Sequence, residues 1–183
     1  MLRIVVCASV TLAATVAFAQ NDMPPPKVVL PAPVGGLVAI ARTPFPSTDV
    51  PENEDFDSTL VVIKDADSRV IARRVFASRF IMKMLWSPDG RFLALCSASA
   101  GGHSPGHMNS YFWSRSDRHF RSIDYRAGYV TTDSLSFAPP HTLTLQIAPI
   151  REGILDINHP VEKQVDLEQI RRTTPPLRGD ANT

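Results

Sequence analysis

Two polar stretches of the chain carry side chains that could ligate a metal ion or contact a ligand. The first lies within residues 43–58 and is rich in carboxylates, at Asp49, Glu52, Glu54, Asp55 and Asp57. Carboxylate oxygens suit calcium, but this spacing matches no calcium-binding loop, and a solvated acidic loop is the simpler interpretation. We therefore treat these carboxylates as candidate binding residues without a metal.

The second stretch, residues 100–107, places His103 and His107 four residues apart. Two imidazoles at this spacing can share a metal ion when a helix aligns them. The glycines and the proline around them oppose a helix, so zinc or copper would need distant ligands such as His119 or His141. A polar loop is the favoured interpretation. Both histidines are candidate binding residues, and we expect no cofactor.

Motifs of catalysis are absent from the sequence. It contains neither the Gly-x-Ser-x-Gly elbow of hydrolases nor the His-Glu-x-x-His helix of zinc proteases, and its glycines fit no phosphate-binding fingerprint. Cys96 lies in an apolar run, which predicts a buried structural thiol. Tyr111, Phe112 and Trp113 are likewise expected to be core residues. We therefore assign no catalytic residue and favour a protein that is not an enzyme.

Basic side chains recur on the expected strands, in two groups: Lys64, Arg69, Arg73, Arg74, Arg79 and Lys83, then Arg115, Arg118, Arg121 and Arg126. Such a pattern could form a basic patch that meets an acidic partner. Ordinary exposed charges on strand faces are the favoured explanation.

The first nineteen residues have the three parts of a secretory signal peptide. A basic start is followed by a short apolar run and a small-x-small site at Ala17-Phe18-Ala19, which predicts cleavage before Gln20. Removal of the leader leaves Cys96 as the sole cysteine and equal numbers of acidic and basic residues. We therefore expect a periplasmic or secreted protein, with no intramolecular disulfide, no nucleic-acid partner and no membrane insertion of the mature chain.

Four segments follow from the composition. Residues 1–19 are the signal peptide, 20–33 a proline-rich extended leader without a core, 34–172 a β-repeat domain and 173–183 a frayed, exposed tail. Short β-branched and aromatic runs separated by turn residues predict eleven strands in the repeat domain, among them 118–125 and 129–137. Residues 166–172 fit one or two helical turns.

The repeat is clearest at Trp86-Ser87-Pro88-Asp89-Gly90, a turn followed by an apolar strand. Pro88 suits the second position of a type I turn, Gly90 is expected at positive φ, and Asp89 is expected to accept local backbone hydrogen bonds. Weaker copies begin near Pro33 and Pro139, at intervals of about fifty residues. Hairpins expected at 60–71, 111–120 and 154–165 repeat at a similar interval.

The Trp-Ser-Pro-Asp-Gly-Arg-Phe-Leu-Ala-Leu segment resembles the blade-joining turn of TolB-like and WD-repeat β-propellers. This resemblance implies blade-like sheets, a turn that joins successive blades, and often a partner-binding role. Eleven strands are too few to close a ring, since propellers have about four to eight blades. We therefore expect an all-β fold of antiparallel blade-like repeated sheets, an incomplete propeller-like array, with a compact β-sandwich as the alternative.

The favoured function is a non-catalytic binding protein that engages another envelope protein or a surface ligand. Its site would be the loops 43–58, 97–110 and 148–153, which the repeat places on one face. The alternative is a metal-dependent hydrolase that uses His103, His107 and the acidic loop. Unpaired sheet edges also favour a homodimer or an obligate complex.

Overall fold

The computed structural model describes the chain at residues 15–17, 27–45, 58–76, 81–98, 108–131, 134–151 and 153–178. Within these residues the chain forms fourteen β-strands and two short α-helices, and every strand pairing is antiparallel. The fold is therefore all-β, as the sequence predicts, and twelve of the described strands lie within residues 34–172, where eleven are expected.

The first sheet contains β2 (Lys27–Pro31), β3 (Val38–Phe45), β4 (Ser58–Lys64) and β5 (Val70–Phe76), paired in chain order. Burial alternates along its strands, because successive side chains of a strand point to opposite faces of the sheet. In β2, for example, Val28 and Leu30 are buried and their neighbours are exposed. The expected leader is thus extended at 27–31, but this part belongs to the first sheet and its core.

The second sheet contains β6 (Ile81–Trp86), β7 (Phe92–Ala98), β8 (Met108–Ser114) and β9 (Phe120–Ser122), again in chain order. Residues 92–97 of β7 are all buried, since both faces of this sheet are covered. On the outer edge of β6 lies β1 (Thr15–Ala17), which pairs with it between Leu85 and Lys83. β1 falls inside the predicted signal peptide.

The third layer contains β10 (Ser136–Ala138), β11 (Thr142–Ile147) and β14 (Val161–Asp166), with β11 in the middle. A separate hairpin of β12 (Ile150–Arg151) and β13 (Ile154–Leu155) lies between β11 and β14 in the chain. The helices are α1 (Asp124–Ala127), after β9, and α2 (Leu167–Thr173), after β14. The expected helical turns at 166–172 are therefore confirmed.

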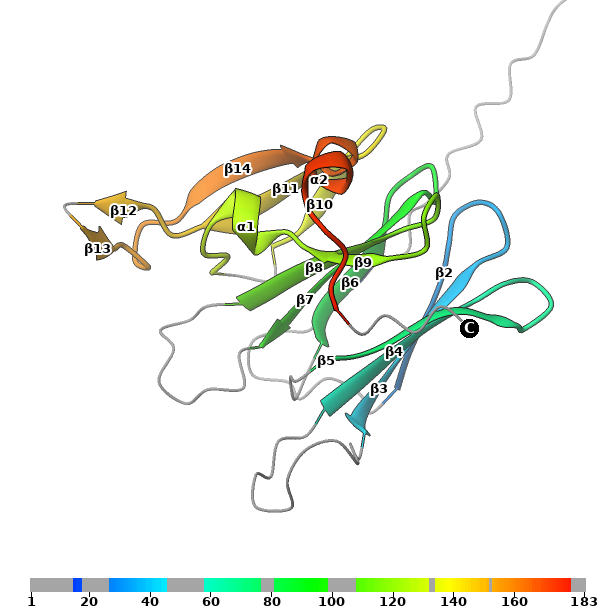
Figure 1. Cartoon of the computed structure of the whole chain (residues 1–183). Coiled ribbons are helices and arrows are strands. Elements are labelled where there is room, and N and C mark those ends of the chain that lie inside the picture. Colours follow the sequence, from blue (N-terminus) through cyan, green and yellow to red (C-terminus); the bar gives the residue numbers. More distant parts are fainter. Residues whose placement is uncertain are drawn as a thin grey trace, which may run out of the picture.

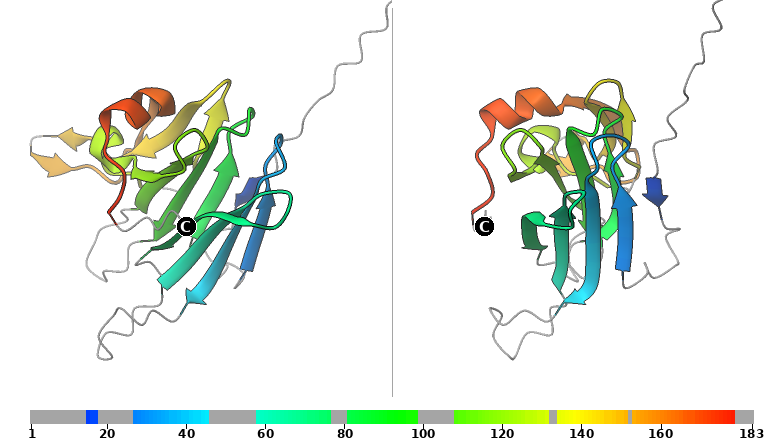
Figure 2. Two further views of the ribbon diagram at one scale, coloured as in Figure 1. Left: turned by 45° about the vertical axis from the view of Figure 1, so that its right-hand side comes forward. Right: turned by 90° about the vertical axis from the view of Figure 1, so that its right-hand side faces the viewer.

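The three sheets form a stack with two apolar cores (Figures 1 and 2). Between the first and second sheets lie Leu30, Ile63, Trp86, Leu93 and Trp113, among others. On the other side of the second sheet, Phe92, Phe112 and Ile123 pack against Leu143 of the third sheet and Ile170 of α2. Antiparallel sheets are thus confirmed, in three layers rather than the two of a sandwich.

The predicted repeat turns occupy equivalent places in the three sheets. Residues 32–37 join β2 to β3, residues 87–91 join β6 to β7, and residues 139–141 join β10 to β11. Each turn therefore connects the first two strands of one sheet. The propeller resemblance implied a turn between successive blades, and this detail is wrong here, because β6 and β7 are paired neighbours.

The Ser87–Gly90 turn has the predicted local chemistry. Gly90 has a φ of 66° and donates its N–H to the Ser87 carbonyl at 2.9 Å. The Asp89 carboxylate accepts from the Ser87 hydroxyl at 2.6 Å and from the Arg91 N–H at 3.1 Å. Trp86, next to the turn, is buried and donates its indole Nε1–H to the Leu30 carbonyl at 3.1 Å, so it ties the second sheet to β2.

Four other expectations differ from the structure. The expected strand at 129–137 is reduced to an isolated bridge at Val130 and to β10, and α1 replaces the end of the strand expected at 118–125. The hairpin expected at 154–165 does not form, because β13 pairs with β12 whereas β14 pairs with β11. Residues 174–178 of the expected frayed tail are ordered across the outer edges of the first two sheets.

We call residues 174–178 the C-terminal strap. The Leu177 N–H donates to the Phe120 carbonyl of β9 at 2.9 Å, and Arg121 Nε donates to the Thr174 carbonyl at 3.0 Å. Arg74 of β5 donates to the Arg178 carbonyl at 3.2 Å. The side chain of Leu177 packs against the core between the first two sheets. The strap thus covers part of the outer edge that the strand count left open.

Candidate functional site

The binding residues predicted from sequence lie outside the described residues. These are the carboxylates Asp49, Glu52, Glu54, Asp55 and Asp57 and the histidines His103 and His107. Their flanking strands are placed: β3 and β7 run toward the same end of the stack (Figures 1 and 2). Val130 forms bridges with both Met108 of β8 and Ile147 of β11, which brings the second and third sheets together at that end. We call this end of the stack the loop end.

A cavity of about 490 Å³ opens beside the start of β8, and we call it the corner pocket. It is lined by Asn109, Tyr111, Ser122, Asp124, Gly128, Tyr129 and Leu177. These residues come from β8, from the end of β9, from α1 and the segment after it, and from the C-terminal strap. Pairing of Tyr111 with Ser122 in the β8–β9 ladder holds the two strands of its wall in register.

Asp124 supplies the charge of the corner pocket. It is the first residue of α1, and its two carboxylate oxygens accept from the Ser110 N–H at 3.1 and 3.3 Å. Its own N–H donates to the Ser122 hydroxyl at 3.2 Å. Burial raises the pKa of the Asp124 carboxyl to about 7, although the hydrogen bond from Ser110 opposes this shift. The group can therefore hold or release a proton near neutral pH.

Two tyrosines form the aromatic part of the pocket. The Tyr111 ring contacts Phe76 of the first sheet, with ring centroids 4.7 Å apart. Burial raises the pKa of the Tyr111 hydroxyl, the nearby Asp124 charge raises it further, and Arg74 partly opposes both. Tyr129 is 48% exposed. The predicted core role of Phe112 and Trp113 is confirmed, whereas Tyr111 is only partly buried and faces the pocket.

The arrangement suits recognition better than nucleophilic chemistry. Ser122 is the hydroxyl nearest to Asp124 in sequence, but it accepts from the Asp124 backbone N–H, and the Asp124 carboxylate accepts from Ser110. A nucleophile needs a base within hydrogen-bond reach of its hydroxyl, and no such bond links these two side chains among the described contacts. Carboxyl, amide and tyrosine groups beside an apolar side chain are typical of ligand sites.

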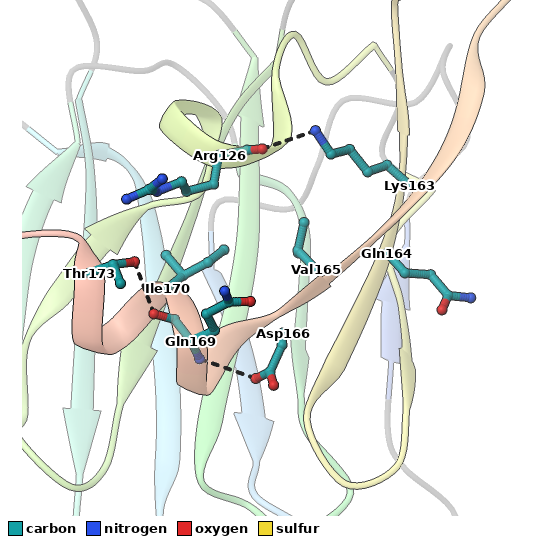
Figure 3. A pocket seen from close by; sticks show the side chains of 8 residues that line it. All are labelled: Arg126, Lys163, Gln164, Val165, Asp166, Gln169, Ile170 and Thr173. Carbon is teal, nitrogen blue, oxygen red and sulfur yellow. Dashed lines mark hydrogen bonds between the residues drawn. The ribbon is translucent and has the colours of Figure 1, made fainter.

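A second cavity, of about 270 Å³, lies between α1, β14 and α2 (Figure 3). Its polar groups support the local fold. Lys163 Nζ donates to the Arg126 and Ala127 carbonyls at 3.0 and 2.9 Å, which fixes α1 to β14. Asp166 caps α2 by accepting from the N–H groups of Glu168 and Gln169 at 2.8 and 3.2 Å. We therefore interpret this cavity as a packing gap beneath α2.

An ion-pair network fixes α2 to the second sheet. Arg171 donates to Glu168 at 2.7 Å and to Asp117 at 3.5 Å, and Asp117 accepts from Arg121 of β9 at 2.8 Å. The Arg171 guanidinium, together with Arg172 and Arg91, lowers the pKa of Glu168 to about 2, against a partial desolvation effect. These charges position the helix and line no part of the corner pocket.

A metal ion would need several His, Cys, Asp or Glu side chains that lie close together. In the described part of the chain, no group of three or more His, Cys, Asp or Glu residues could hold a metal ion. His119 and His141, the distant ligands considered from sequence, contact Asp117 and Asp166 respectively. Cys96 is a buried cysteine, as predicted.

The corner pocket was not predicted from the sequence. Asn109, Ser122, Asp124 and Tyr129 belong to no motif, and Leu177 lies in the segment expected to be frayed. One signal was present: Asp124 is a charged residue inside a stretch expected to be a half-buried strand, and an isolated carboxylate there predicts either a strand end or a perturbed group.

No protein-family model matches the chain, and no curated protein matches it. Of the helices in the described segments, neither is long and apolar enough to cross a membrane.

Proposed function

We propose that the chain is a non-catalytic binding protein of the periplasm or the extracellular space, which engages another envelope protein or a surface ligand at the loop end. The observation that carries this proposal is the corner pocket, where a carboxyl group of raised pKa and two tyrosines meet beside the start of β8. Loops and pockets at the end of a rigid sheet stack are common sites of recognition.

The proposed location rests on the leader. Cleavage after Ala19 would start the mature chain at Gln20, and Edman or mass-spectrometric sequencing of the secreted protein is expected to find that N-terminus, free or as pyroglutamate. Mature protein that retains Met1 would contradict both the cleavage and the proposed compartment.

Cleavage would also remove β1 from the edge of β6. The backbone groups of Met84 that face β1 would then be open to another strand, and open edges favour pairing between chains. We propose a homodimer or an obligate complex as one consequence. Light scattering of the processed chain at tens of micromolar tests the homodimer, and a clean monomer without aggregation would contradict it.

The direct test of the binding role compares Tyr129→Ser with Val34→Ser. Both side chains are about half exposed, at 48% and 46%, but only Tyr129 lines the corner pocket. In a pull-down from envelope extract, the Tyr129 variant is expected to lose the specific partner and the Val34 variant to keep it. Equal capture by both variants would place the binding surface elsewhere.

Elemental analysis separates the alternative function. Stoichiometric zinc or calcium in the purified protein would favour a metal-dependent hydrolase with ligands from the His103 and His107 loop and the acidic loop. It would contradict a purely non-catalytic role.

A further inference from the structure

The first sheet has one face that no other described element covers. Its inner face, with Leu30, Ile63 and their neighbours, packs on the second sheet. In the right-hand view of Figure 2 the first sheet lies at the front, and no other described strand or helix lies over it. We call this surface the outer face; it lies on the side of the first sheet away from the second sheet.

The strand register brings apolar side chains together at the centre of the outer face. Val29 is paired with Ile40, and Ile40 with Val62; in the adjacent row, Leu60 is paired with Val75. Paired residues of neighbouring strands point to the same face, so these five side chains form one patch. Val29 and Val75 are 49% and 41% exposed, and the other three are partly exposed.

The rim of this patch is basic. Lys27 and Arg42 continue the row of Leu60, Arg73 continues the row of Val62, and Lys64 lies opposite Val38. None of the four strands contains an aspartate or a glutamate. The outer face thus combines an uncovered apolar centre with a rim of positively charged side chains. Soluble sheets that face water usually carry mixed polar residues there, and a contiguous apolar patch with a polar rim is typical of an interaction surface.

We propose that the outer face docks a partner protein whose own surface has an apolar centre and a rim of carboxylates. In the second sheet both apolar faces are covered by other apolar layers, and the outer face of the first sheet lacks such a cover among the described elements. Charge decides which partner can cover the first sheet. A second copy would bring like-charged rims together, whereas an acidic rim would pair with Lys27, Arg42, Lys64 and Arg73. This surface is separate from the corner pocket, so the inference does not rest on the proposed function.

Site-specific photo-crosslinking in cells that express the whole chain tests the proposal. Val29 is replaced by p-benzoylphenylalanine, and Val34, which is similarly exposed but lies in the β2–β3 turn, is the matched control. We expect an adduct from position 29 and none from position 34. Mass spectrometry of the adduct is expected to find a partner segment that carries aspartate or glutamate beside apolar residues.

The dependence on charge is tested with the rim variant K27Q/R42Q/R73Q in the same crosslinking background. None of these three side chains makes a described hydrogen bond or ion pair, so thermal unfolding is expected to be unchanged while adduct yield falls roughly tenfold. An adduct that is insensitive to the rim, an adduct to a second copy, or no adduct at position 29 would each overturn the proposal. A third variant carries the crosslinker in place of Tyr129 in the corner pocket. An adduct from position 129 with none from position 29 would overturn this proposal while preserving the proposed function.

Discussion

β3 and β7 are the second strands of their sheets, yet they are buried differently. In β7 residues 92–97 are all buried, whereas in β3 only alternate residues are, with Ala39 and Ala41 facing the second sheet and Val38 and Ile40 partly exposed. The difference follows from the stack: β7 lies in the middle layer and β3 in an end layer. A continuous apolar run therefore indicates a sheet covered on both faces, and an alternating one indicates a sheet covered on one.

The largest effect should come from truncating a core side chain in the second sheet, which is covered on both faces. Leu95→Ala removes a fully buried side chain of β7, and we expect the free energy of unfolding in urea to fall by about 2–5 kcal/mol. Leu60→Ala makes the same change on the outer face of the first sheet, where about 1 kcal/mol or less is expected. Equal losses would mean that the outer face is covered and that the two sheets do not differ.

Gly90→Ala tests the contact between the first sheet and the second sheet. At the positive φ of Gly90 an added Cβ would lie 2.9 Å from the Val34 carbonyl oxygen of the neighbouring turn, so both strain and overlap destabilise the variant. We expect a loss of about 2 kcal/mol in urea unfolding. Gly153→Ala has a similar φ but no atom within 4 Å, and it should lose about 1 kcal/mol. Gly153→Ala costing as much as Gly90→Ala would show that overlap with Val34 contributes nothing.

The end of the middle layer is tested by Asp124→Asn. Because the pKa of Asp124 is raised to about 7 in the fold, the native state binds its proton more tightly than the unfolded state, and stability falls as pH rises from about 4 to 7. The asparagine removes that loss. We expect the variant to be more stable than the wild type by roughly 1–2 kcal/mol at pH 8, with little difference near pH 4. A difference that does not depend on pH would contradict the raised pKa.

The smallest effect is expected in α2, which covers the side of the second sheet that faces away from the first sheet. Glu168 holds Arg171 of α2, and its pKa is lowered to about 2, so its stabilising effect is present above about pH 4.5 and is lost as pH falls toward 2. We expect Glu168→Gln to lose less than about 1 kcal/mol at pH 7, because the network is partly solvated. Urea unfolding at pH 7 and pH 2.5 measures the difference, which should be much smaller at the lower pH.

Local features of the fold were predictable because they depend on neighbouring residues. Gly90, Pro88 and Asp89 define their turn by backbone geometry and by hydrogen bonds within five residues, and the sequence predicts this turn correctly. The all-β class follows from alternating short strands in the same way. The third layer was less predictable, because β14 pairs with β11 across an inserted hairpin, and only tertiary packing selects that partner.

The corner pocket was unpredictable for a similar reason. Asn109, Asp124 and Leu177 are distant in the sequence, and they meet only because β8 pairs with β9 and the strap returns to β9. The raised pKa of Asp124 depends on burial by those segments rather than on any adjacent residue. The carboxylate and histidine loops, which composition does single out, lie outside the described residues.

The contacts of the C-terminal strap can form only after the strands that it touches have been made. Apart from the pairings of β1 with β6 and of β11 with β14, neighbouring strands of each sheet follow one another along the chain, so much of each sheet can form as it emerges during synthesis or export. The strap is the last described segment to emerge, and its contacts reach back to Phe120 and Arg74. Until then the Phe120 carbonyl lacks the Leu177 N–H, and the core beside Leu177 is open at that edge. This edge of the domain is therefore closed only once residues 174–178 have been made.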